Sequence, residues 1–84
     1  MIFVVYAPVN FGEGVQTVIV TENIDNAIPK YIEAGHNAEI EIWENEKELL
    51  SYGFIKWHNH TDPKAIKREI ELALNDVRNK EQVL

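Results

Sequence analysis

The apolar positions near the amino terminus of this 84-residue chain predict two neighbouring strands. A continuous apolar run over residues 2–7, rich in β-branched and aromatic side chains, predicts a strand buried on both faces. A second β-branched run over residues 15–21 predicts its hairpin partner. The seven residues between them, 8–14, are mostly turn formers and make a long hairpin loop, the kind of segment that often carries functional residues.

The apolar spacing then changes to that of an amphipathic helix. Ile24, Ala27, Ile28, Tyr31 and Ile32 recur at helical intervals. We expect Asp25 or Asn26 to cap this helix, so that the regular part begins near residue 26 and Pro29 lies in the first turn. Gly35 is expected to end the helix in a left-handed conformation.

Residues 39–42 alternate strictly between glutamate and isoleucine. This pattern predicts a strand with Ile40 and Ile42 inward and with Glu39 and Glu41 outward. Residues 54–58 are the candidate for a fourth strand. The intervening residues 44–53 fit either a short helical turn around residues 46–50, closed by a glycine, or an irregular hairpin connection, and the pattern does not decide between them.

The last element is the clearest helix of the chain. Asp62 followed by Pro63 is a typical helix start, with a capping acid before proline at the first helical position. The apolar face that follows consists of Ile66, Ile70, Ala73, Leu74 and Val77. The helix is expected to end near residue 79, with residues from about 80 to 84 frayed.

The predicted order of elements is β-β-α-β-β-α. It indicates one small α+β domain over residues 1–84, with an antiparallel sheet of three or four strands and two helices on one face. The order is shared by many unrelated domains, so it identifies no family and fixes no function.

Composition excludes several classes of protein. The chain has no cysteine, which removes thiol catalysis, disulfides and thiolate metal sites. No apolar run approaches the roughly 20 residues of a membrane span. The amino terminus lacks the basic flank and the length of a signal peptide, so a cytoplasmic location is expected.

The net charge of −6 is unevenly distributed. Residues 1–63 hold ten acids and three bases, whereas residues 64–84 hold four acids and five bases. A protein that binds nucleic acid by neutralising phosphates usually carries a basic excess. Direct nucleic-acid binding is therefore disfavoured.

An acidic stretch in the middle of the chain is the first candidate for function. Its members are Glu39, Glu41, Glu44, Glu46 and Glu48, offset only by Lys47. A solvated face would explain such a run, but a negative strip would also match a basic surface on a partner protein and steer association with it. Phe11, an aromatic residue among turn formers, either folds back over the sheet edge or adds to such an interface.

A second candidate is a ligand or metal site near the segment that precedes the last helix. His58 and His60 would share one face of a strand, and Phe11 and Glu13 of the first loop are expected to complete a pocket with them. His36 would be a third metal ligand only if the fold brings it close. Zinc needs three or four converging ligands, which makes the metal version weak.

No arrangement of residues typical of an enzyme active site is present, and no cofactor is implied. The preferred hypothesis is a non-enzymatic regulator or inhibitor that covers a partner protein through the acidic stretch or Phe11. The alternative is the small-ligand binder, with its site at a dimer interface. Trp43 and Trp57 on an uncovered sheet face would also favour a homodimer or a protein partner.

Overall fold

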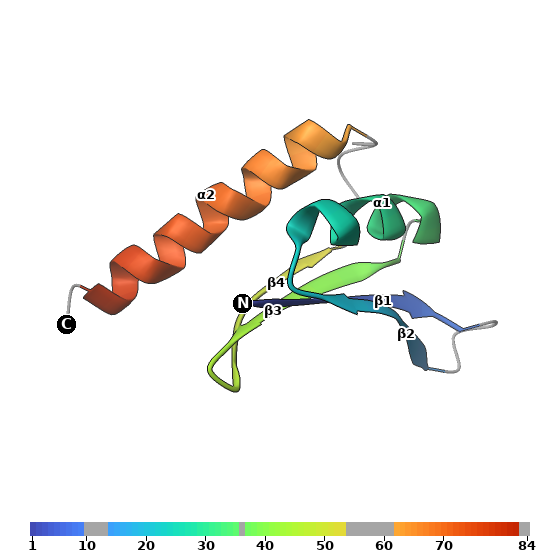
Figure 1. The fold of residues 1–84 in the computed structure, drawn as a ribbon, viewed down its shortest axis with the longest axis horizontal. Coiled ribbons are helices and arrows are strands. Elements are labelled where there is room, and N and C mark those ends of the chain that lie inside the picture. The colour runs from blue at the N-terminus through green and yellow to red at the C-terminus, as the bar shows by residue number, and fades with distance from the viewer. Residues whose placement is uncertain (10–13, 36, 54–61, 83–84) are drawn as a thin grey trace.

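The computed structural model describes residues 1–9, 14–35, 37–53 and 62–82. Six elements follow one another along the chain, in the predicted order (Figure 1). They are β1 (Ile2–Pro8), β2 (Val15–Thr21), α1 (Ile24–Ala34), β3 (Glu39–Glu44), β4 (Lys47–Gly53) and α2 (Pro63–Gln82). The predicted fold class, a single small α+β domain, is confirmed.

The four strands form one antiparallel sheet in the order β2-β1-β3-β4. The first pair of strands is the predicted hairpin, with a bulge in β2 opposite Val5 and Tyr6. The central strands β1 and β3 pair over five residues, with Val4 opposite Glu41 at the middle of the register. The outer strands β2 and β4 are thus the two edges of the sheet.

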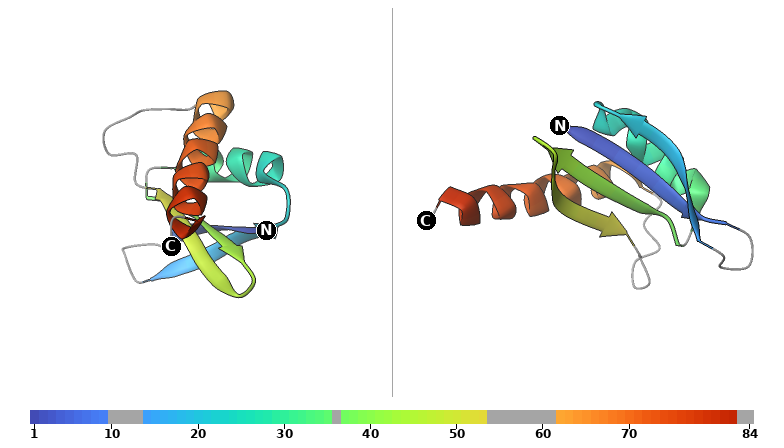
Figure 2. Two further views of the ribbon diagram at one scale, coloured as in Figure 1. Left: turned by 90° about the vertical axis from the view of Figure 1, so that its left-hand side faces the viewer. Right: turned by 90° about the horizontal axis from the view of Figure 1, so that it is seen from below.

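Both helices cover the same face of the sheet, and none of the described elements covers the other face (Figure 2, right). The core lies between the sheet and the helices; its buried side chains are Phe3, Val5, Ala27, Ile28, Tyr31, Ala38, Ile40, Ile42, Ile66, Ile70 and Leu74. The inward orientation of Ile40 and Ile42 is confirmed.

The prediction that the first strand is buried on both faces is wrong. Phe3 and Val5 point to the helices and are buried, whereas Ile2, on the other face, is 41% exposed. Val4 and Tyr6 are half-buried on the same uncovered face. The reason is that both helices lie on one face of a four-stranded sheet, so every second side chain of β1 points away from the helix layer.

Helix α1 begins two residues earlier than expected. Its cap is Asn23, whose side-chain oxygen accepts a hydrogen bond of 2.9 Å from the backbone N–H of Asp25, so neither Asp25 nor Asn26 caps it. Pro29 consequently lies inside the helix, beyond the first turn, where it removes one backbone hydrogen bond on the exposed side. Gly35 follows the last helical residue with a positive φ of 93°.

Strands β3 and β4 form a tight hairpin in the segment where the sequence left two options open. Glu44 pairs with Lys47, and the two residues between them, Asn45 and Glu46, both have positive φ, of 54° and 65°. This backbone is that of a type I′ turn, whose twist matches that of the flanking strands. Both options are therefore wrong: residues 46–50 form no helical turn, and in place of an irregular connection the segment contains the fourth strand of the sheet itself. The strand expected at 54–58 lies outside the described residues.

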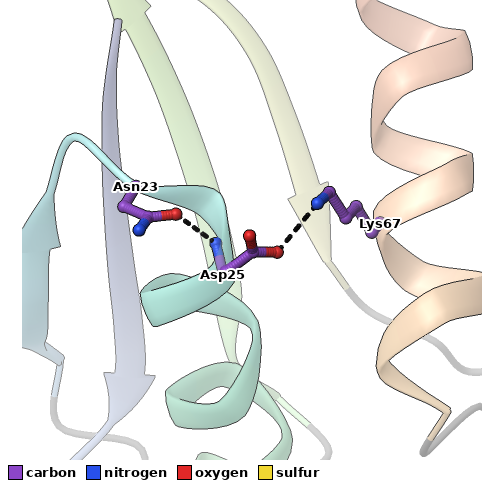
Figure 3. Close-up of polar contacts among 3 residues, drawn as sticks. All are labelled: Asn23, Asp25 and Lys67. Atoms are coloured by element: carbon purple, nitrogen blue, oxygen red, sulfur yellow. Dashed lines mark hydrogen bonds and ion pairs between the residues drawn. The ribbon is translucent and has the colours of Figure 1, made fainter.

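Helix α2 begins at Pro63 as predicted, and the side chain of Asp62 accepts a hydrogen bond of 3.0 Å from the backbone N–H of Lys64. It continues to Gln82, three residues past the expected end. Its Lys67 forms an ion pair of 2.9 Å with Asp25 at the start of α1 (Figure 3). None of the helices in the described part of the chain is both long and apolar enough to cross a membrane.

Candidate functional site

The uncovered side of the sheet, which we call the open face, is the candidate site. Side chains alternate across a strand, so the register of the four strands shows which residues share this side. The open face includes Ile2, Val4, Tyr6, Val20, Glu39, Glu41, Trp43 and Glu48, together with Pro8, Val15, Thr17 and Ser51. It therefore combines exposed aliphatic residues, two aromatic rings and three carboxylates on one surface.

Glu41 occupies the middle of the open face, between two aromatic residues. Its Oε1 accepts a hydrogen bond of 3.0 Å from the indole Nε1 of Trp43, which lies two residues along the same side of β3. Tyr6, on the adjacent strand β1, also interacts with this carboxylate. Burial raises the pKa of the Tyr6 hydroxyl, and the charge and hydrogen bonding of Glu41 raise it further. The three half-buried side chains thus form one polar cluster.

The electrostatics of the open face are uniformly negative. Glu39 lies opposite Tyr6, and Glu48 lies opposite Trp43. The charge of Glu48 contributes to the raised pKa of the Tyr6 hydroxyl, which shows that the carboxylates influence the same region. None of the residues that the described strands place on this face is basic. An approaching cation therefore meets only carboxylates among the charged side chains that the described strands place on this face.

A shallow hollow of about 410 Å³ lies at one end of the open face, where β1 begins and the β3–β4 hairpin turns. Its floor and walls come from the open face and the hairpin: Met1, Ile2, Val4, Tyr6, Glu22, Trp43, Glu44, Asn45 and Glu46. The hollow is wide and open to solvent, unlike an enclosed small-molecule cavity. It fits a side chain or a segment of a partner protein better than a buried cofactor.

The acidic residues of the stretch over residues 39–48 do not all lie on the same side of the sheet. Glu39 and Glu41 point outward on the open face, as the alternation of their strand predicts. Glu44 is one residue past Trp43 and turns toward the helices, where its carboxylate lies 3.5 Å from the guanidinium of Arg78 on α2. Glu46 occupies the exposed hairpin turn beside the hollow. The acidic strip is therefore shorter than the sequence suggested.

The residues of the alternative ligand site lie outside the described part of the chain. These are Phe11 and Glu13 of the first loop, together with His58 and His60; His36 and Trp57 also fall there. Among the residues that the structure does describe, no group of three or more histidine, aspartate or glutamate side chains is placed to hold a metal ion.

Sequence reasoning missed the aromatic part of the site. The apolar run over residues 2–7 predicts that Val4 and Tyr6 are buried, and it does not show that they share a face of the sheet with Trp43. A continuous apolar run does not distinguish a strand that is covered on both faces of the sheet from a strand that is covered on one face only. The alternation in residues 39–43 was the available signal, because it continues from Glu39 and Glu41 to Trp43 on the same side.

No protein-family model, curated protein or solved structure matches this chain.

Proposed function

We propose that this protein is a cytoplasmic, non-enzymatic interaction module, a regulator or inhibitor that covers a positively charged surface of a partner protein with its open face. The observation that carries the proposal is the cluster of Glu41, Trp43 and Tyr6 at the centre of an uncovered sheet face. A carboxylate held between two aromatic rings suits a guanidinium or ammonium group, which gains both an ion pair and contact with a ring.

Arginine suits the cluster better than lysine does. Its planar guanidinium can stack on the indole of Trp43 while its N–H groups bond to the lone pairs that remain on Glu41. Glu39 and Glu48, on neighbouring positions of the same face, would attract further cations and accelerate encounter at low salt. The exposed Ile2 and Val20 supply the apolar contact that a lasting interface needs.

A protein partner is favoured over a nucleic acid. The carboxylates of the open face would repel phosphates, and a phosphate backbone has no cation to place between Tyr6 and Trp43. Because the carboxylates are carried by a rigid sheet, the face can compete with other anions for a basic surface, which is how an acidic inhibitor would act.

The test uses a defined probe, a short glycine–arginine peptide, and follows the fluorescence of Trp43 in a background in which Trp57 is replaced by phenylalanine. Addition of the peptide should change the Trp43 emission, with an affinity that falls as salt is added. A matched glycine–glutamate peptide should have no effect. A glycine–lysine peptide should bind more weakly than the arginine peptide.

Two variants with the same change in net charge separate the site from the overall charge. Glu41→Gln removes the central carboxylate, whereas Glu33→Gln removes an exposed carboxylate from α1, on the opposite side of the sheet. We expect Glu41→Gln to weaken binding roughly tenfold, the loss typical of one charged hydrogen-bonded pair. Equal weakening by the two variants, or unchanged Trp43 emission, would rule out the proposed site.

A further inference from the structure

The strand β2 forms one edge of the sheet that the described strands make. Among the strands that the structure describes, none lies beyond β2 in the order β2-β1-β3-β4 (Figure 2, right). All seven of its residues are exposed or half-buried, with Val15 at 66% and Val20 at 60%. Helix α1 packs against β2 from the helix side of the sheet.

The two edges of the sheet differ in how they are protected against further pairing. Natural edge strands commonly carry charged residues, prolines or bulges that prevent another strand from adding to them. Strand β4 carries Lys47 and Glu48 and is flanked by α2. Strand β2 has the sequence Val-Gln-Thr-Val-Ile-Val-Thr, without a charge or a proline. Its one protective feature is the bulge opposite Val5 and Tyr6, which leaves regular strand on both sides.

The distribution of charge indicates which kind of strand could pair with the β2 edge. Two copies of a chain with a net charge of −6 repel each other, and contact between two open faces would bring their Glu39, Glu41 and Glu48 side chains together. The seven residues of β2 are neutral, so two copies can meet there without placing the carboxylates of one strand against those of the other. A basic segment, in contrast, would be drawn to the open face.

We propose that β2 pairs antiparallel with the β2 strand of a second copy, which joins two four-stranded sheets into one sheet of eight strands. The β-branched residues Val15, Thr17, Val18 and Val20 would form cross-strand pairs between the copies. A two-fold axis perpendicular to the sheet relates strands joined in this way, so both open faces lie on the same side. The dimer does not depend on the proposed function, although it would present the open face twice.

Sedimentation velocity of the full chain, from low to high micromolar concentration, tests this proposal. We expect a dimer that dissociates on dilution. Val20→Lys places a charge on the edge and should raise the dimer dissociation constant at least roughly tenfold, whereas Val20→Thr keeps a neutral β-branched residue and should leave it nearly unchanged. Leu72→Lys, at a residue that is 57% exposed on α2, makes the same kind of substitution away from the edge and should not affect dimerisation.

A second variant and a second measurement protect the test against a folding defect. Val18→Lys should act as Val20→Lys does, and the melting temperature of each variant shows whether the monomer remains folded. In the wild type, hydrogen exchange of the β2 amides should slow as the protein concentration rises. A wild-type chain that stays monomeric throughout, or a dimer that is insensitive to both lysine substitutions, would overturn the proposal. Either result would leave the arginine-peptide test of the open face unaffected.

Discussion

The hydroxyl of Tyr52 on β4 donates a hydrogen bond of 2.5 Å to Oε2 of Glu69 on α2. The ring of Tyr52 also packs against Tyr31 of α1, with ring centroids 5.8 Å apart and planes inclined by 55°. One side chain of the edge strand thus contacts both helices. This contact holds α2 on the part of the sheet that α1 does not cover.

Replacing Tyr52 with phenylalanine tests the strength of that contact. Tyr52→Phe keeps the ring against Tyr31 and removes the hydrogen bond to Glu69, so we expect the free energy of unfolding in urea to fall by about 1–2 kcal/mol. Glu69→Gln, alone and combined with Tyr52→Phe, completes a double-mutant cycle that isolates the pair. Additive losses in the double variant would show that the two residues do not interact.

The buried tyrosines predict a loss of stability at high pH. Burial, followed by the charge of Glu69, raises the pKa of Tyr31 from its usual 10 to about 12. Burial and the hydrogen bond to Glu69 raise the pKa of Tyr52 as well. The unfolded chain loses these protons first, so stability should be fully present below pH 10 and decline as the pH rises through 12.

Urea unfolding at a series of alkaline pH values measures this decline. Tyr31→Phe combined with Tyr52→Phe should flatten the profile above pH 10, because neither ring can then ionise. An ultraviolet titration of the folded protein should show these two phenols ionising later than free tyrosine. Stability that stays constant up to pH 12 would contradict the raised pKa values.

The β3–β4 turn contains a residue in an unfavourable conformation. Glu46 has a φ of 65°, which a side chain with a Cβ atom adopts at a cost of roughly 1–2 kcal/mol and glycine adopts freely. Glycine also increases the conformational entropy of the unfolded chain, which offsets part of this gain. The net effect of Glu46→Gly should be to stabilise the protein by about 0.5–1 kcal/mol. Glu46→Ala removes the same charge and keeps the Cβ, so it should give no such gain. Equal melting temperatures for the two variants would contradict this account.

The cap of α1 should contribute more to stability than the ion pair next to it. Asn23→Ala leaves the backbone N–H of Asp25 without its capping oxygen and should cost about 1 kcal/mol. Lys67→Met breaks the ion pair with Asp25, but both of these charges are substantially exposed, so its cost should be smaller than that of Asn23→Ala and should disappear in salt. Thermal melts at low and high salt distinguish the two, and the reverse ranking would contradict the argument.

Several elements were predictable because their local chemistry leaves few alternatives. Asp62 and Pro63 specify where α2 begins, and the alternation of residues 39–42 specifies which side of β3 is inward. The start of α1 was less certain because Asn23, Asp25 and Asn26 are all capable caps. The cap is the residue whose side chain accepts a hydrogen bond from a backbone N–H of the first helical turn, and a single sequence does not show which residue that is.

Strand β4 and the open face required tertiary information. Residues 47–50 are Lys-Glu-Leu-Leu, which favours a helix in isolation, and pairing with β3 overrides that preference. The outward direction of Glu39 and Glu41 was predictable from alternation. The turn of Glu44 toward Arg78 and the grouping of Glu41 with Trp43 and Tyr6 depend on where the helices lie and on how β1 pairs with β3.

The strand order has a consequence for how the domain holds together. The chain consists of two successive ββα halves, each with an inner strand, an outer strand and a helix, and the inner strands run antiparallel at the centre of the sheet. The second half thus repeats the element order of the first, and the pairing of the two inner strands is centred on Val4 and Glu41, although the sequences of the halves show no repeat. Each half supplies one side of the core, with Val5 from the first packed beside Ile40 from the second. Separation of the halves would expose both sides at once, so the domain should unfold as one cooperative unit.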